Sequence, residues 1–108
     1  MTGRLVRRGL VALVMATLPL PAAAEEQVKG DIEYGEYLSA ECVACHQTKG
    51  HNPGIPQIAG MNATGMVAIL RAYKAKELEN ATMQTIAARL DDEQMAALAV
   101  FYASLPAE

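Results

Sequence analysis

The sequence predicts a single all-α domain preceded by a leader segment. Apolar residues recur at the three- and four-residue spacing of a helix in several stretches after residue 30, and no stretch shows the alternation typical of a strand. Residues that can cap a helix precede the three longer stretches, namely Asp31, Asn62 or Thr64, and Asp91. The chain of 108 residues has no internal repeat and is long enough for one small domain.

The first helix is expected over residues 32 to about 41, with Asp31 as its N-cap. Ile32, Gly35 and Leu38 fall on or near one face of it. A glycine in a helix costs about 1 kcal/mol relative to alanine. Close approach of another helix would explain Gly35, and simple tolerance of a glycine near a helix end is the alternative.

Three more helices are expected after a loop rich in glycine and proline over residues 47–56. They span residues 63 to 76 or 77, residues 83 to about 90 after a break at 79–82, and residues 92–104. Asp91 and Gln94 have the spacing of a capping box for the last one. Their inward-facing residues are predicted to be Met66, Val67, Leu70, Tyr73, Ile86, Ala87, Met95, Leu98, Ala99 and Tyr102.

Residues 1–24 have the pattern of a secretory signal peptide. Three arginines precede an uncharged apolar run over residues 9–18, prolines break the run, and Ala22-Ala23-Ala24 gives an A-x-A cleavage site. The run is too short to cross a bilayer as a permanent helix, although a retained membrane anchor is the alternative. We expect cleavage after about Ala24, export to the periplasm, and a mature domain over residues 25–108.

The net charge changes sharply when the leader is set aside. The leader holds three of the nine basic residues and none of the twelve acidic ones, so residues 25–108 carry six basic against twelve acidic residues, a formal charge of −6. This charge argues against a nucleic-acid partner. It favours a partner with a positive docking patch, although a merely solvated surface explains it equally well.

The segment Cys42-Val43-Ala44-Cys45-His46 carries the chemistry. Two cysteines three residues apart, followed at once by a histidine, are typical of a covalent haem c attachment site, in which the histidine binds the iron. A thioredoxin-like redox pair would need a βαβ pattern, which is absent. A structural zinc site would need a fourth ligand, and the one other histidine is His51. Haem would also add apolar core to a domain that is small.

The second axial position of the iron decides the function. A methionine there favours electron transfer, whereas an open position permits gas binding or peroxide chemistry. Met66 and Met95 fall at helical spacing among apolar residues, which favours core packing, and His51 lies only five residues from His46. Met83 follows an irregular segment well downstream of His46, where the returning chain can cover the far face of the haem; Met61 is also possible.

The loop before the second helix can steady His46. A metal-bound histidine needs an acceptor for its other ring nitrogen, and a backbone carbonyl beside a proline is well suited. Pro53 and Pro56 both qualify, and an ordinary turn is the alternative. Ile58 would then pack against the edge of the haem.

The whole of the predicted mature chain resembles the small bacterial class I cytochromes c, and most of all the haem subunit of flavocytochrome c sulfide dehydrogenase. The haem motif is highly specific, and the other matching segments are specific only together. These segments are Cys42-Val43-Ala44-Cys45-His46, Ile55-Pro56-Gln57-Ile58-Ala59-Gly60, Ala72-Tyr73-Lys74, Met83-Gln84-Thr85-Ile86-Ala87 and Leu90-Asp91-Asp92-Glu93-Gln94.

The resemblance implies a small cytochrome c fold, with three main helices and a short one around a single covalently bound haem. It implies Met83 as the distal ligand and Pro56 as the proline whose carbonyl holds the proximal imidazole. It also implies that Gly35 and Leu38 cross Leu98 and Tyr102. Relatives commonly have glycine where Lys76 stands, and often glutamine where Met61 stands, so Met61 is the main rival ligand.

The expected function is one-electron transfer by an exported single-haem cytochrome c, with no substrate chemistry of its own. The favoured setting is a periplasmic complex with a flavoprotein that oxidises sulfide. The alternatives are a free carrier between a dehydrogenase or membrane complex and a terminal oxidase, and a peroxidase or gas-binding haem protein.

Overall fold

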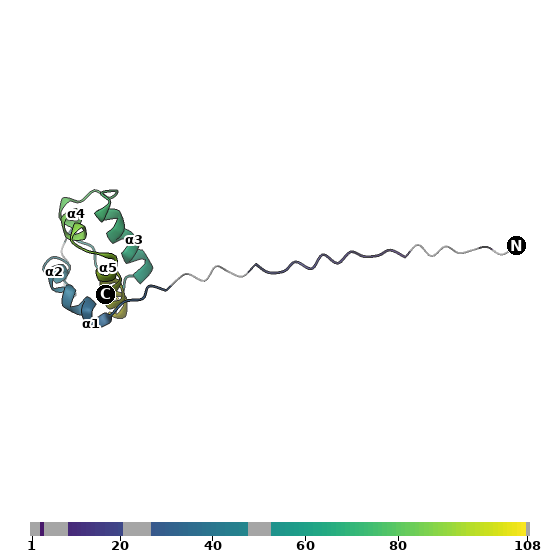
Figure 1. The fold of residues 1–108 in the computed structure, drawn as a ribbon, viewed down its shortest axis with the longest axis horizontal. Coiled ribbons are helices and arrows are strands. Elements are labelled where there is room, and N and C mark those ends of the chain that lie inside the picture. Colours follow the sequence, from purple (N-terminus) through teal and green to yellow (C-terminus); the bar gives the residue numbers. More distant parts are fainter. Residues whose placement is uncertain (1–2, 4–8, 21–26, 48–52, 108) are drawn as a thin grey trace.

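A computed structural model describes residues 3, 9–20, 27–47 and 53–107. This part of the chain contains helices and no strand, which confirms the all-α prediction. Five helices form one small body, with α1 and α5 side by side at one end and α3 and α4 covering the other (Figure 1). The helices are α1 Ile32–Leu38, α2 Ala40–Val43, α3 Ala63–Lys74, α4 Ala81–Ala88 and α5 Asp92–Ser104.

The crossing of α1 and α5 explains Gly35. A Cβ atom added at this position would lie 2.0 Å from the carbonyl oxygen of Ala97 and 2.7 Å from Cβ of Phe101. Only glycine therefore allows the two backbones to come this close. The expected close approach is present. On α5, Gly35 meets the backbone carbonyl group of Ala97 and the side chain of Phe101.

The first predicted helix is divided in the structure, which corrects the expectation of one helix to residue 41. Asp31 caps α1 as predicted, and its side chain accepts a hydrogen bond from the amide of Tyr34 at 3.2 Å. Ser39 then separates α1 from α2, and its hydroxyl donates to the carbonyl oxygen of Glu36 at 2.6 Å. A serine hydroxyl that bonds back to the preceding turn competes with the regular helix, which accounts for the division.

Helix α3 begins at the predicted place and ends earlier than predicted. Asn62, not Thr64, is the N-cap, because its side chain accepts from the amide of Gly65 at 3.0 Å. The helix stops at Lys74, since the chain turns into the left-handed region at Lys76, where φ is 59°. Glu77 N bonds to Ala72 O at 2.9 Å, which makes a Schellman motif with lysine where glycine is usual.

Helix α4 begins two residues before the predicted start, so residues 81 and 82 do not belong to a break. Asn80 is its N-cap, and its side chain accepts from the amide of Met83 at 2.9 Å. Gln84 Nε2 also donates to the carbonyl of Leu78 at 2.8 Å. These side chains fix the start of α4, and they place Met83 within its first turn rather than at its first residue.

Helix α5 matches the prediction at both ends, and Asp91 and Gln94 form the expected capping box. It supplies much of the core, in which Tyr102 and Met95 are the largest fully buried side chains. The core residues come from α3, α4, α5 and the turn between the last two helices. They are Met66, Val67, Leu70, Ala87, Leu90, Met95, Ala97, Leu98, Ala99 and Tyr102.

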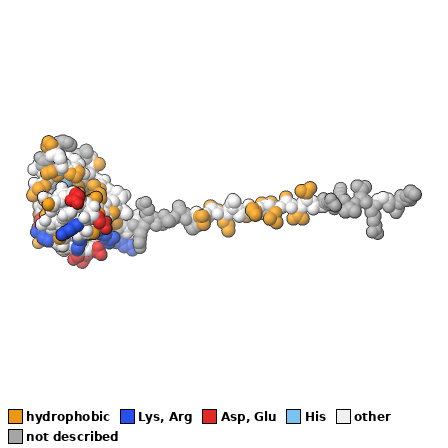
Figure 2. All heavy atoms as spheres, turned by 90° about the horizontal axis from the view of Figure 1, so that it is seen from above, with side chains coloured by type: hydrophobic (Ala, Val, Ile, Leu, Met, Phe, Trp, Pro, Cys, Tyr) orange, Lys and Arg blue, Asp and Glu red, His pale blue; other side chains and the backbone are white. Residues whose placement is uncertain are grey.

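The segment 9–20 is extended and exposed, and it stands clear of the helical body (Figures 1 and 2). Its apolar side chains contact no core; Leu10, for example, is 97% exposed. Among the described residues, no helix has the length and apolar character needed to cross a membrane. The predicted cleavage site at residues 22–24 lies outside the described residues, and cleavage stays a prediction.

Candidate haem site

The two cysteines and the histidine lie on one turn of chain at the end of α2. The amides of Cys45 and His46 both bond to the carbonyl oxygen of Cys42, at 3.2 and 2.7 Å. Cys42 is half-buried and packs against the core, whereas Cys45 is exposed, and no disulfide joins them. This turn therefore presents both sulfur atoms and the imidazole within one short, hydrogen-bonded unit.

The imidazole of His46 is oriented by the loop that follows it. Its Nδ1 lies 2.8 Å from the carbonyl oxygen of Pro56, ten residues further along the chain. A carbonyl can only accept, so Nδ1 carries a proton, and in the neutral ring Nε2 then has the lone pair. This is the tautomer in which Nε2 can bind a metal, with the other nitrogen held by an acceptor.

The end of the same loop is fastened to α5. Gly60 adopts a φ of 75°, and its amide donates to the carbonyl oxygen of Tyr102 at 2.9 Å. A Cβ atom at Gly60 would also lie 2.7 Å from Cβ of Ala107. Ile58, two residues before Gly60, is half-buried and packs against the core. The loop therefore brings Ile58 to the edge of the core, while its end at Gly60 is held on the last helix.

The four methionines in residues 25–108 divide into two groups. Met66 and Met95 are buried within the core, with 5% and 1% of their surface exposed. Met61 and Met83 are half-buried and pack against the edge of the core. Met83 stands in the first turn of α4, and Met61 follows the Pro56 loop. His51 lies outside the described residues.

These residues fit a haem rather than a bare metal ion. The turn offers two thiols for covalent attachment and an imidazole in the correct tautomer, and Ile58, Met61 and Met83 supply partly buried apolar surface close to the core. Within the described ranges, no group of three or more histidine, cysteine, aspartate or glutamate side chains is arranged to hold an ion, which the zinc alternative requires.

Comparison with known proteins decides between a haem site and a zinc site. The family model for cytochrome c matches residues 32–106, from the start of α1 to the residue after Leu105. The chain belongs to the cytochrome c family. It is therefore an electron carrier with haem c attached covalently through Cys42 and Cys45.

Two relatives illustrate the range of this cytochrome family. Cytochrome c-554(548) of Halomonas halodenitrificans is 36% identical over 80 residues, which cover 69% of this chain and 96% of that protein. The gluconate 2-dehydrogenase cytochrome c subunit of Pantoea cypripedii is 40% identical over 55 residues, which cover 45% of this chain and 12% of that protein. The cytochrome thus matches nearly the whole of one relative and a small part of the other.

The two groups beside the attachment turn of this cytochrome have shifted pKa values. Burial raises the pKa of the Cys42 thiol, the Tyr102 hydroxyl lowers it, and the charge of Glu41 raises it further. Burial likewise raises the pKa of Tyr102. Before haem is attached, both groups are therefore protonated at neutral pH. The sequence identified Tyr102 only as a core residue, because helical spacing shows that a side chain faces inward and not which polar group it meets.

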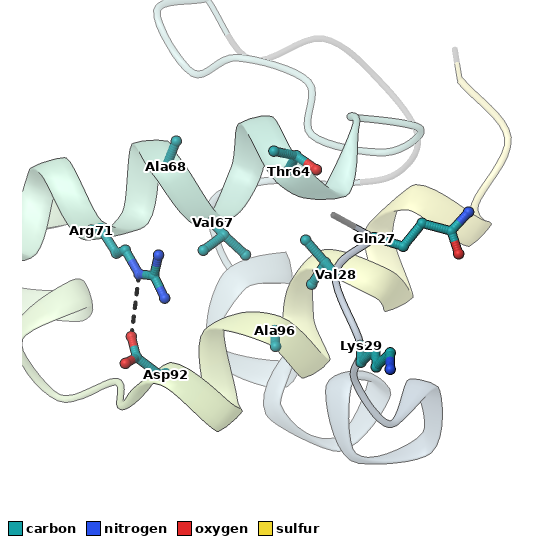
Figure 3. Close-up of a pocket in the computed structure, with 9 residues that line it drawn as sticks. All are labelled: Gln27, Val28, Lys29, Thr64, Val67, Ala68, Arg71, Asp92 and Ala96. Carbon is teal, nitrogen blue, oxygen red and sulfur yellow. Dashed lines mark hydrogen bonds and ion pairs between the residues drawn. The ribbon is translucent and has the colours of Figure 1, made fainter. Parts of the chain in front are cut away.

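Two exposed ion pairs and a hollow lie on the surface of the described part of the cytochrome. Glu41 of α2 pairs with Arg89 after α4 at 3.4 Å, and both side chains are more than half exposed, so the pair contributes little to stability. A hollow lies between residues 27–29, α3 and α5, with the Arg71–Asp92 pair at its edge (Figure 3). None of the residues assigned to haem lines it.

Proposed function

We propose that His46 and Met83 would be the two protein ligands that hold the haem iron. Bound haem supplies one-electron Fe(III)/Fe(II) chemistry, and a methionine ligand favours electron transfer. The observation that carries this proposal is the 2.8 Å bond between His46 Nδ1 and the Pro56 carbonyl, which leaves Nε2 for the metal.

Support for Met83 over Met61 comes from how its helix begins. The Asn80 side chain binds the Met83 amide at 2.9 Å, which fixes the backbone of the ligand residue on a regular helix. Met61 lies in a segment without helix or strand, although the bond between its amide and Ile58 O at 3.2 Å restrains it. A preorganised backbone places a ligand with less loss of entropy.

Replacing each methionine by alanine tests the ligand assignment. The ferric protein should show the weak far-red absorption band of methionine ligation, and Met83→Ala should abolish it. Met61→Ala is the matched control, because it removes the same kind of side chain, likewise half-buried against the core, and it should keep the band. Loss of the band in Met61→Ala, with retention in Met83→Ala, would make Met61 the ligand.

The favoured setting is the periplasm, with the haem accepting electrons from a flavoprotein that oxidises sulfide. The segment with the pattern of a signal peptide supports export. The resemblance of the Cys42, Pro56 and Met83 segments to the sulfide dehydrogenase haem subunit supports the flavoprotein. The formal charge of −6 over residues 25–108 suits a partner with a basic surface, because opposite charges speed encounter.

A free carrier is the second candidate. It is favoured by cytochrome c-554(548), since 96% of that protein aligns with this chain and leaves no room there for a further domain. Isolation of the tagged cytochrome from its native periplasm at low ionic strength separates the candidates. A co-purifying flavin-containing subunit that reduces the haem when sulfide is added supports the first, and a monomer that sulfide leaves oxidised in the same extract supports the second.

A further inference from the structure

Tyr102 carries a buried hydroxyl with no evident partner. Its side chain is 1% exposed on α5, and its Oη makes no hydrogen bond of standard geometry within the described part of the chain. Burying a hydroxyl without a partner costs about 1 to 3 kcal/mol, and a phenylalanine would fill the same space without this cost. The hydroxyl therefore calls for an explanation.

Besides burial, two polar groups lie close enough to this hydroxyl to shift its pKa. The thiol of Cys42 raises the pKa, and the hydroxyl of Ser39 lowers it. Cys42 packs against the core cluster to which Tyr102 belongs. Ser39 is 6% exposed, and its own proton is donated to the carbonyl of Glu36 at 2.6 Å. The proton of Tyr102 is therefore available for the sulfur or for a lone pair of Ser39.

Haem attachment changes what the sulfur of Cys42 can do. A thiol is both a weak donor and a weak acceptor, whereas a thioether sulfur has no proton and can only accept. Once Cys42 is bonded to haem, Tyr102 can serve the sulfur only as a donor. We propose that Tyr102 is a positioning residue for the haem, with its hydroxyl donating a hydrogen bond to the sulfur of the Cys42 thioether.

This hydrogen bond has a functional consequence. It draws electron density away from the sulfur and hence from the attached porphyrin, which favours the reduced, more electron-rich state of the haem. It also fixes one of the two attachment points relative to α5, as outer hydrogen bonds do for metal ligands. The proposal depends on covalent attachment through Cys42, and it holds whichever methionine binds the iron and whichever protein supplies the electron.

The test is Tyr102→Phe in the holoprotein, which removes the hydroxyl and keeps the ring. We expect a lower reduction potential in a spectroelectrochemical titration and an approximately fivefold smaller folding equilibrium constant in a denaturant titration, as for one net hydrogen bond. Tyr34→Phe is the matched control, because the Tyr34 hydroxyl accepts from Gln94 Nε2 at 3.3 Å on the α1–α5 side. It should leave the potential unchanged.

Two outcomes would overturn the proposal. If Tyr102→Phe keeps the potential and raises the denaturation midpoint, the hydroxyl is an unsatisfied group that the core tolerates. Ser39→Ala tests whether the Tyr102 hydroxyl acts through Ser39, and the variant should keep the wild-type reduction potential. If Ser39→Ala instead reproduces the shift in potential of Tyr102→Phe, the hydroxyl acts through Ser39 and not through the sulfur.

Discussion

The packing of α1 against α5 brings two helix backbones together, whereas the loop from Pro56 to Gly60 and the start of α4, which the proposed function places beside the haem, are anchored by single hydrogen bonds. At Gly35 the two helix backbones leave no room for even a methyl group. In the second region, single hydrogen bonds join His46 to Pro56, Gly60 to Tyr102 and Met83 to Asn80. Added side-chain volume should therefore destabilise the first region, and removal of a hydrogen-bonding side chain should disturb the second.

The largest effect is expected from Gly35→Ala. The new Cβ would lie 2.0 Å from Ala97 O, so α1 and α5 must separate, and overpacking of this kind costs about 3 kcal/mol. A denaturant titration of the holoprotein would measure the loss. Gly65→Ala is the matched control, since its Cβ would meet only Asn62 Oδ1 at 3.9 Å, and it should stabilise the protein by about 0.5 kcal/mol. Equal stability of the two variants would contradict this account of the crossing.

An intermediate effect is expected from the two asparagine caps. Asn80→Ala and Asn62→Ala each remove an N-cap, and each should cost about 1 kcal/mol in free energy of unfolding. Only Asn80 begins the helix that carries Met83, so only Asn80→Ala should speed the binding of added imidazole to the ferric haem. Stopped-flow absorbance measures this rate. Similar rates in both variants would show that the start of α4 does not control access to the iron.

An effect of similar size but opposite sign is expected from Lys76→Gly. A left-handed φ of 59° disfavours a lysine, and glycine should raise the free energy of unfolding by about 1 kcal/mol. Ala75→Gly, at the preceding right-handed position, should lower the free energy of unfolding by about 0.5 kcal/mol. Thermal unfolding of the two variants checks the opposite signs. A destabilised Lys76→Gly variant would mean that the lysine side chain contributes more than its backbone costs.

Helix patterns in the sequence predicted the first region well. Helical spacing identified the inward face of α5, and the pairing of Asp91 with Gln94 placed its first residue, because a capping box is a local signal. Gly35 could be recognised as a position of close approach from its cost in a helix. The partners of Gly35 on α5, Ala97 and Phe101, depend on how the helices cross, which spacing along one chain does not contain.

The second region was less predictable from local patterns. The cap at Asn80 was missed because the apolar spacing of the helix becomes visible only from Met83 onward. The first region has one comparable failure: Ser39 was not recognised as a break because its hydroxyl bonds to its own helix. The attachment motif was recognised because its chemistry fixes its spacing. The contact between Tyr102 and Cys42 joins residues sixty apart, and only the folded chain brings them together.

The bond between His46 and Pro56 also bears on how this protein can be altered. It joins two residues that are ten apart in the chain. The position of Pro56, and not the number of residues between it and His46, brings the carbonyl to the imidazole. The entropy of closing a loop grows slowly with length, by about 0.6 kcal/mol for each doubling. Insertions between these residues should therefore cost little, so this loop is a suitable place to graft a binding sequence next to the redox centre.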